Sequence, residues 1–205
     1  MKRLGLILIL SIVIAPAWAA KFEKGKHYVE IPFSEELDTG NKVEVREFFW
    51  YGCGHCYKFE PMLDQWLKNK PSAALFVRTP AFPRKVVHAN SYHAFEAMGI
   101  VDKIHRKFFD ALHVDGKRLD TVDAVADFVA ANGFDKGEFR KKYKSFAVDH
   151  KTRKGFQLGT SYGVKSVPVI VVDGRYKFSA STVGNNKRVI ELMDYLVKKI
   201  AKEKR

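Results

Sequence analysis

The sequence predicts an α/β fold in which a sheet domain is interrupted by an inserted block of helices. Two apolar strands flank an amphipathic helix between residues 43 and 79, a long stretch without strand patterns follows, and β patterns return near the C-terminus. We therefore expect a sheet domain made of residues 20–85 and 163–205, with a helical domain of residues 86–162 inserted into it. The 205 residues, of which 46% are hydrophobic, suffice to bury the core of such a domain.

An export signal precedes the expected fold. Lys2-Arg3 is basic, Leu4–Ile14 is apolar, and Ala17-Trp18-Ala19 has the small-x-small pattern of a cleavage site. An uncleaved membrane anchor would need about 18 or more apolar residues, more than this apolar stretch contains. We expect residues 1–19 to be a signal peptide, so that the mature protein is exported from the cytoplasm.

The chain is strongly basic, with a formal net charge of +13. Such a charge can attract nucleic acid, acidic lipid headgroups or acidic proteins. An exported protein seldom meets nucleic acid, however, and the lysines and arginines are spread along predicted helices at residues 140–144, 151–154 and 198–205. We therefore interpret them as solvated helix faces and expect no nucleic-acid partner.

The first strands lead up to a cysteine motif. Lys26–Ile31 is expected to form a short strand, and Val43–Trp50 has the strongest strand pattern in the chain. Its alternation places the carboxylate of Glu47 on the same face as the apolar Val45 and Phe49. Glu47 could be a buried acid paired with a lysine, a residue at a sheet edge, or a proton acceptor beneath a reactive site with its pKa raised by burial. The sequence leaves these interpretations open.

The motif itself is Cys53-Gly54-His55-Cys56, and it holds both cysteines of the chain. A C-x-x-C sequence after a strand and before a helix is the signature of a thioredoxin-like redox site. Cys53 would lie at the helix N-terminus, where free N–H groups and the helix dipole favour a thiolate. Cys56 would lie one turn further in, shielded by Cys53.

Three other interpretations of the cysteine pair are weaker. A zinc site needs four ligands, whereas the pair supplies two, no second C-x-x-C is present, and His88/His93 is the only histidine pair with suitable spacing. A c-type haem would need a histidine where Tyr57 stands. A purely structural disulfide across so short a loop would stabilise the fold by only about 2 kcal/mol. We therefore expect redox chemistry of the thiols, with no metal and no cofactor.

The segment after the motif completes a βαβ unit. A helix is expected at residues 56–68, kinked at Pro61, and a second strand at Ala73–Thr79. Two strands joined in this way should be parallel, with a right-handed crossover. The helix should bury its apolar positions, namely Phe59, Met62, Leu63, Trp66 and Leu67.

Helices are expected throughout the middle of the chain. Their predicted positions are Val86–Gly99, Ile100–His113, a segment from Asp120 to Asn132-Gly133, Asp135–Phe146 and Ala147–Tyr162. Asp120 is interpreted as the N-cap of the third helix, because its side chain can accept hydrogen bonds from the first turn. The histidines of this region are expected at the surface or the edge of the core rather than as ligands, namely His88, His93, His105 and His113.

β structure returns towards the C-terminus. Val167–Val172 is expected to be a strand with Pro168 near its start, Asp173-Gly174 a hairpin turn, and Arg175–Phe178 the returning strand. A final helix carries an apolar stripe of Val189, Ile190, Met193, Leu196, Val197 and Ile200. The resulting order of one strand, a βαβ unit, helices and a ββα unit is the basis of the predicted fold class.

These features together resemble the DsbA family of thiol:disulfide oxidoreductases, which act in the periplasm of Gram-negative bacteria. The resemblance rests on the element order, the export signal, the motif EFFWYGCGHCYKFEP and the later motif GVKSVPVIVVDGRY, and it covers nearly all of the mature chain. It implies a thioredoxin fold with an inserted helical domain. It also implies a periplasmic enzyme that introduces disulfide bonds into reduced exported proteins, is reoxidised by a DsbB-like inner-membrane protein, and works as a monomer.

The resemblance also implies roles for individual residues. Cys53 matches the nucleophile and Cys56 the buried resolving cysteine, while His55 matches the histidine that stabilises the thiolate. Glu47 stands where the family keeps a buried acid under the site. Val167-Pro168 matches the family's cis-proline loop, which faces the cysteines and pairs with the substrate backbone; without the resemblance, a trans proline on an edge strand would be the expectation.

The motif departs from the family pattern at one position, because many members carry proline where this chain has Gly54. Gly-His is the central dipeptide of eukaryotic protein disulfide isomerases, so the redox potential stays open. We expect the reduced protein to be more stable than the oxidised protein at pH 7, which requires a folded pKa of Cys53 below about 5.5.

Two other functions remain alternatives. One is a disulfide isomerase or reductase of the same fold, although isomerases of this compartment usually carry an N-terminal dimerisation domain before the first strands. The other is a non-enzymatic chaperone that uses the helical insertion as a docking surface. Replacing both cysteines by serine separates the two classes, because it abolishes oxidase activity and spares a binding protein.

Overall fold

The computed structural model describes residues 22–32, 37–81 and 86–204, so the predicted signal peptide lies outside the described residues. Within these ranges the chain forms five strands: β1 (Val29–Glu30), β2 (Val43–Phe49), β3 (Ala74–Pro80), β4 (Val169–Val172) and β5 (Tyr176–Phe178). The same ranges contain eight helices: α1 (Gly54–Asn69), α2 (Val86–Ala97), α3 (Val101–His113), α4 (Val122–Ala131), α5 (Lys136–Tyr143), α6 (Phe146–Ser161), α7 (Ala180–Val183) and α8 (Asn186–Glu203). None of these helices is both long and apolar enough to cross a membrane.

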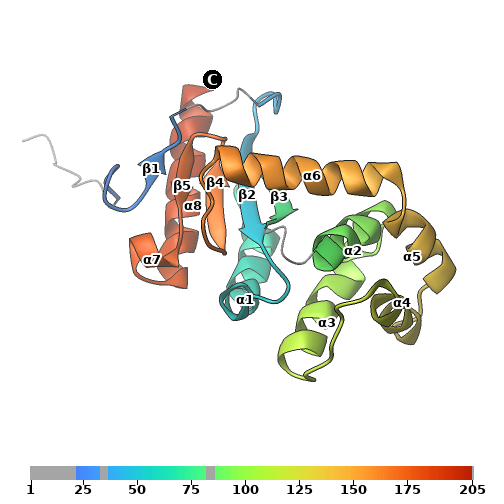
Figure 1. Cartoon of the computed structure of the whole chain (residues 1–205). Helices are drawn as coiled ribbons and strands as arrows, with labels where there is room; N and C mark the ends of the chain where they lie inside the picture. Colours follow the sequence, from blue (N-terminus) through green and yellow to red (C-terminus); the bar gives the residue numbers. More distant parts are fainter. Residues whose placement is uncertain (1–21, 33–36, 82–85, 205) are drawn as a thin grey trace, which may run out of the picture.

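The strands form one mixed sheet in the order β1-β5-β4-β2-β3 (Figure 1). β2 pairs in parallel with β3, and α1 connects them, which confirms the predicted βαβ unit. The other pairs are antiparallel, including β4 with β5 around the Asp173-Gly174 turn. Glu47 of β2 lies between Arg78 of β3 and Ile170 of β4. It therefore occupies a central strand, and its interpretation as an edge residue is wrong.

Helices cover both faces of the sheet, which explains why β2 is buried along almost its whole length (Figure 1). α1 and α8 pack against one face, where Val45 joins Leu63 and a row of α8 side chains. α6 crosses the other face, where Phe48 packs edge-on against Tyr162. A strand covered on both sides is usually a continuous apolar run. Two carboxylates of β2 are exceptions: Glu44 is buried and paired with Arg46 of the same strand, and Glu47 is wholly buried beneath the segment that leads to the cysteines.

The helices α2 to α5 form a separate block beside the sheet, and α6 returns from this block to the sheet (Figure 1). The block has its own core of buried aromatic and aliphatic side chains, which includes Phe108 and Phe109 of α3. Phe49 and Tyr51, at and just after the end of β2, enter the same core. The segment that leads to the cysteines is therefore held between the sheet and the helical block.

α6 connects the two parts of the molecule through small residues. A Cβ on Gly155 would lie 3.0 Å from the Thr79 side chain of β3, and a Cβ on Gly159 would lie 3.6 Å from the Phe48 ring. Val148, near the other end of the same helix, is buried in the core of the helical block. Both parts thus share α6, and the domain boundaries drawn from the sequence stay a prediction.

The N-cap predicted for α4 is wrong. This helix begins at Val122, so the residue before it is Thr121 and not Asp120. The Thr121 hydroxyl accepts a hydrogen bond from the Ala124 backbone N–H at 3.2 Å. A threonine at this position satisfies a free N–H group of the first turn in the same way as the aspartate was expected to.

Helix bounds and buried positions also differ in places from the predictions. α1 begins at Gly54 and continues through Pro61. On α8, Leu192 is fully buried, whereas Ile190, which was expected in the apolar stripe, is half-buried. The sequence pattern does not indicate α7, which spans only four residues. The histidines expected at the surface or the core edge include three that are buried, namely His88, His93 and His105.

Candidate active site

The two cysteines lie where β2 gives way to α1. Cys53 is the N-cap of α1, with an extended backbone, and its sulfur accepts a hydrogen bond from the Cys56 backbone N–H at 3.4 Å. Both thiols are free; Cys53 is half-buried, whereas Cys56 is completely buried in the core that Phe49 and Tyr51 share with the helical block. The expected difference in exposure between the two thiols is confirmed.

The surroundings shift the two thiols in opposite directions. A hydrogen bond from the Cys56 side chain lowers the pKa of Cys53 to about 6, although partial burial opposes this shift. The backbone N–H groups of Cys56 and His55 and the charge of the exposed His55 side chain lower the same pKa further. Burial raises the pKa of Cys56 far above its usual range, and the hydrogen bond to Cys53 and the charge of Glu47 add to that shift. One thiol is thus prepared to ionise and the other to stay protonated.

A proline loop faces the more reactive sulfur. The Val167–Pro168 peptide bond is cis, as the family resemblance implies. The Val167 carbonyl oxygen accepts a hydrogen bond from the Cys53 thiol at 3.4 Å. A groove of about 400 Å³ opens beside this contact, lined by His55, Ser166, Val167, Pro168, Ser179, Ala180, Ser181, Gly184 and Asn186. Part of its wall comes from α7, so the sequence pattern, which does not indicate α7, could not locate the groove.

A buried charged cluster lies beneath the cysteines, starting from Glu47. Its carboxylate lies 3.3 Å from the Arg78 guanidinium, so its partner is an arginine and not the expected lysine. Arg78 also lies 3.1 Å from the carboxylate of Glu60, a buried residue of α1. Burial and the charge of Glu60 raise the pKa of Glu47 to about 8, even though Arg78 acts against this. Two buried acids therefore share one arginine, and Glu47 is the one that holds a proton near neutral pH.

The cluster extends into the helical block through His105 of α3. Its Nε2 lies 3.3 Å from the Glu60 carboxylate, and its Nδ1 lies 2.7 Å from the Tyr51 hydroxyl. Burial lowers the pKa of His105, which favours the neutral ring. Burial alone would raise the pKa of Glu60, but the hydrogen bond with His105 and the charge of Arg78 lower it overall. Glu60 is therefore the ionised acid of the pair.

Sequence reasoning missed Glu60, Arg78 and His105, although one signal for Glu60 was available. Glu60 follows Cys56 by four residues, a spacing that places both side chains on one face of a helix. Since Cys56 is expected to be shielded, the carboxylate of Glu60 on the same helix face is also expected to be buried. Arg78 and His105 carry no comparable signal, because their contacts with the two acids bridge separate elements.

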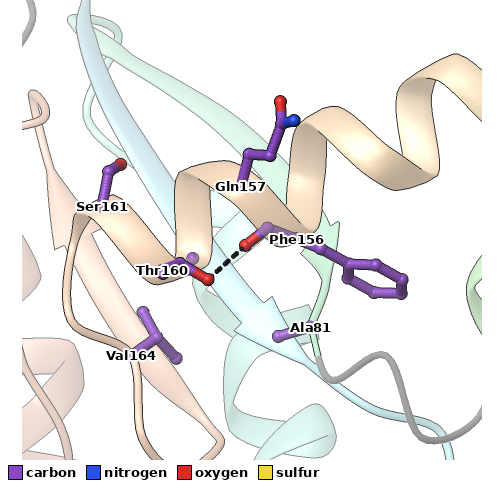
Figure 2. A pocket seen from close by; sticks show the side chains of 7 residues that line it. Ala81, Phe156, Gln157, Thr160, Ser161 and Val164 are labelled. Carbon is purple, nitrogen blue, oxygen red and sulfur yellow. Dashed lines mark hydrogen bonds between the residues drawn. The ribbon is translucent and has the colours of Figure 1, made fainter.

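A second hollow lies away from the cysteines, along α6 (Figure 2). Its volume is about 460 Å³, and it is lined by Ala81, Phe156, Gln157, Gly159, Thr160, Ser161 and Val164. The Thr160 hydroxyl donates a hydrogen bond to the Phe156 carbonyl oxygen, so this polar group is satisfied within the helix (Figure 2). None of the predicted site residues lines this hollow. In the described ranges, no group of three or more His, Cys, Asp or Glu side chains could hold a metal ion.

Comparison with known proteins places this geometry in a family. The profile of the DSBA-like thioredoxin domain matches residues 84–196. The thiol:disulfide interchange protein DsbA of Azotobacter vinelandii is 39% identical over 180 residues, covering 87% of this chain and 84% of that protein. The protein of the same name from Pseudomonas aeruginosa is 36% identical over 197 residues, covering 95% of this chain and 93% of its own.

Solved structures agree with the sequence matches. The crystal structure of Pseudomonas aeruginosa DsbA superposes with a TM-score of 0.85 at 37% identity, covering 91% of this chain and 99% of that one. The oxidoreductase DsbA from Xylella fastidiosa gives a TM-score of 0.78 at 27% identity, covering 84% of this chain and 94% of that one. The predicted thioredoxin fold with inserted helices is confirmed. The chain belongs to the DSBA-like thioredoxin family.

Proposed function

We propose that this thiol:disulfide oxidoreductase is a dithiol oxidase, which passes a disulfide between Cys53 and Cys56 to exported proteins that still carry free thiols. The observation that carries the proposal is the asymmetry of the pair. The pKa of Cys53 is lowered to about 6, whereas burial raises the pKa of Cys56. Disulfide exchange needs one sulfur that is accessible and leaves readily as a thiolate, next to a second that is kept from reacting with other thiols.

The exchange has two steps. A substrate thiolate attacks the Cys53 sulfur of the oxidised enzyme, the bond between the two cysteines breaks, and Cys56 leaves with the electron pair. A second substrate thiolate then attacks the substrate sulfur of the mixed disulfide, and Cys53 leaves as a thiolate. The substrate has lost two electrons and gained a disulfide, and the enzyme is left as a dithiol. The low pKa of Cys53 favours the second step, because a more acidic thiol leaves faster.

Glu47 is the proposed proton donor and acceptor for Cys56. The Cys56 thiolate formed in the first step is buried, so it must gain a proton quickly. The pKa of Glu47 is raised to about 8, although its carboxylate contacts the Arg78 guanidinium at 3.3 Å. It therefore holds a proton at pH 7 that it can give up, and it can take one back when the disulfide re-forms. His55 has the separate role of stabilising the Cys53 thiolate through its charge and its backbone N–H.

Val167 and Pro168 are the proposed contacts for the substrate backbone. Both residues line the groove and Val167 contacts the Cys53 sulfur, so an extended peptide whose thiol reaches Cys53 would lie along them. The groove wall carries Ser166, Ser179 and Ser181, whose hydroxyls can bond to a peptide backbone of any sequence. Such contacts suit an enzyme that accepts many different proteins.

The cellular setting follows from the same proposal. Residues 1–19 would export the chain to the periplasm, where its substrates would be newly exported proteins with reduced cysteines. An inner-membrane protein of the DsbB type would reoxidise the enzyme, and the working form would be a monomer. The support for this setting is the apolar N-terminal segment with its cleavage pattern and the family to which the chain belongs.

The test uses the oxidised mature protein and a reduced, unfolded substrate with several cysteines. We expect the substrate to lose free thiols, and a variant with serine at both Cys53 and Cys56 to leave them unchanged. The equilibrium of the couple with glutathione then gives the direction of the reaction. A reduction potential as low as that of thioredoxin, about −270 mV, would reject the oxidase proposal in favour of a reductase.

A further inference from the structure

A single imidazole of the helical block touches both sides of the cysteine motif. His113, the last residue of α3, donates its Nε2–H to the Tyr51 backbone carbonyl at 2.7 Å. The direction is unambiguous because a carbonyl oxygen can only accept. The same ring stacks on the Tyr57 ring, with centroids 4.9 Å apart and planes inclined by 15°. Tyr51 comes two residues before Cys53 and Tyr57 directly after Cys56, so His113 bridges the start and the end of the motif.

The contact is part of a continuous stripe on α3. Arg106 places its guanidinium 4.6 Å from the centre of the Tyr57 ring, and the Phe109 ring lies 6.2 Å from the same ring. Arg106, Phe109 and His113 follow one another at intervals of three and four residues, which places them on one face of the helix. Tyr57 in turn donates its backbone N–H to the Cys53 carbonyl at 3.0 Å. Through these contacts, α3 of the helical block packs against the first turn of α1, next to the two cysteines.

The reduced and oxidised proteins depend to different degrees on the contacts of His113 with Tyr51 and Tyr57. In the reduced protein, the Cys53 sulfur is stabilised by hydrogen bonds from the Cys56 side chain and from the Cys56 N–H, the latter at 3.4 Å, an ordinary length for a sulfur acceptor. These bonds keep their strength only while the loop holds the Cys53 sulfur in line with its donors. In the oxidised protein, a covalent bond of about 2.05 Å holds the two sulfurs together whatever the loop does. Loosening the loop therefore costs the reduced form more than the oxidised form.

We propose that His113 is a positioning residue, which sets the reduction potential of the Cys53/Cys56 couple by holding the Tyr51 carbonyl. The inference rests on the proposed function, because it assumes that the Cys53 thiolate is the species to be stabilised. His113 touches neither sulfur nor substrate; it acts through the backbone that presents Cys53. The hydrogen bond to Tyr51 is the part of the contact that matters, and the ring stack on Tyr57 holds the imidazole in place for it.

Two substitutions separate the hydrogen bond from the stack. His113→Phe keeps an aromatic ring for Tyr57 and loses the donor, whereas His113→Gln keeps an N–H donor for Tyr51 and loses the ring. The control is His150→Phe, at an exposed histidine that stacks on Phe146 near the start of α6. The measurements are the equilibrium of each variant with reduced and oxidised glutathione, and a titration of the Cys53 thiolate absorbance.

We expect His113→Phe to shift the glutathione equilibrium by about two- to tenfold towards the protein disulfide, the range for one lost hydrogen bond, and to raise the Cys53 pKa. His113→Gln should stay within about twofold of wild type, and His150→Phe should not differ from it. The proposal is overturned if His113→Phe matches wild type in both measurements, or if His113→Gln shifts as far as His113→Phe. A purely structural role would lower the melting temperatures of both redox forms equally and leave the equilibrium unchanged. If wild type itself fails to oxidise a reduced substrate, the proposed function fails instead.

Discussion

Cys53 and Cys56 carry the same chemical group three residues apart at the start of one helix, yet their immediate surroundings differ. Cys53 sits half-exposed at the start of a helix, where hydrogen-bond donors outweigh partial burial and lower its pKa to about 6. Cys56 lies one turn deeper, closed in by side chains of the helical block, and burial dominates. The comparison teaches that a helix N-terminus alone does not decide which thiol ionises. Burial of Cys56 under the inserted helices and the hydrogen bond from Cys56 to Cys53 together decide it.

The largest effect expected from this difference is on alkylation at pH 7. Cys53, with a pKa of about 6, should be about nine-tenths thiolate, whereas a thiol with a pKa above 9 is ionised to about 1% or less. Native reduced protein should therefore be labelled at Cys53 roughly 100-fold faster than at Cys56, as followed by peptide mass spectrometry. The unfolded protein is the control and should label both equally. Preferential labelling of Cys56 in the native protein would reverse the assigned roles.

A second prediction concerns the buried charges beneath Cys56, where Glu47 and Glu60 share one arginine, Arg78. Arg78→Leu should lower the free energy of unfolding by about 3–5 kcal/mol, the usual cost of leaving a buried charge without its partner. Arg140→Leu is the matched control, because the Arg140 pair with Asp123 is exposed and should contribute less than about 1 kcal/mol. Urea denaturation measures both. Equal losses would mean that the acids beneath Cys56 take up protons at little cost.

Glu47→Gln tests the proton held beneath Cys56 through the dependence of stability on pH. The pKa of Glu47 is raised in the folded protein from 4.5 to about 8, so the folded state binds more protons than the unfolded state between these values. Wild-type stability should therefore fall as pH rises through this window, by at most about 1.4 kcal/mol per pH unit from this group. Glu47→Gln should flatten the profile. Parallel profiles for wild type and Glu47→Gln would contradict the raised pKa.

The smallest expected effect is the difference in stability between the oxidised and reduced proteins at pH 7. A pKa of about 6 for Cys53 gives the reduced form no more than about 1.4 kcal/mol, and less once solvent screening of a half-exposed thiolate is considered. Closing the short loop favours the oxidised form by about 2 kcal/mol before strain is subtracted. With the pKa of Cys53 at about 6, the order expected from the sequence is reversed, and the oxidised protein should melt at the same temperature or slightly higher. A reduced form that melts clearly higher would place the Cys53 pKa below about 5.5.

Local patterns made the framework of the site predictable. The strand before Cys53, the helix after it and the βαβ unit all follow from residues close together in the sequence, so periodicity and capping rules apply to them directly. Glu47 is predictable for the same reason, because the alternation along β2 places its carboxylate on the same face as apolar side chains. The cis bond before Pro168 came from the family resemblance, since an isolated sequence favours trans.

The remaining parts of the site depend on contacts between distant segments. Arg78 and His105 are buried because two elements close over them, and nothing near either residue in the sequence records this. His113 reaches Tyr51 across 62 positions. α7 is too short for any period to be detected, and with it the groove beside Cys53 was missed. These features are determined by tertiary packing, which rules based on neighbouring residues in the sequence do not describe.

α6 also limits how the chain can change in length. Because one continuous helix carries Val148 in the helical block and Gly155 against the sheet, the two contacts are tied by helix geometry. Inserting or deleting one residue between them would turn one contact by about 100° relative to the other and move it by about 1.5 Å along the axis. Loops elsewhere can absorb such changes, but this helix cannot. The number of residues from Val148 to Gly155 is therefore fixed by the two contacts. Natural or engineered variants of this protein should differ in length before or after this segment and not within it.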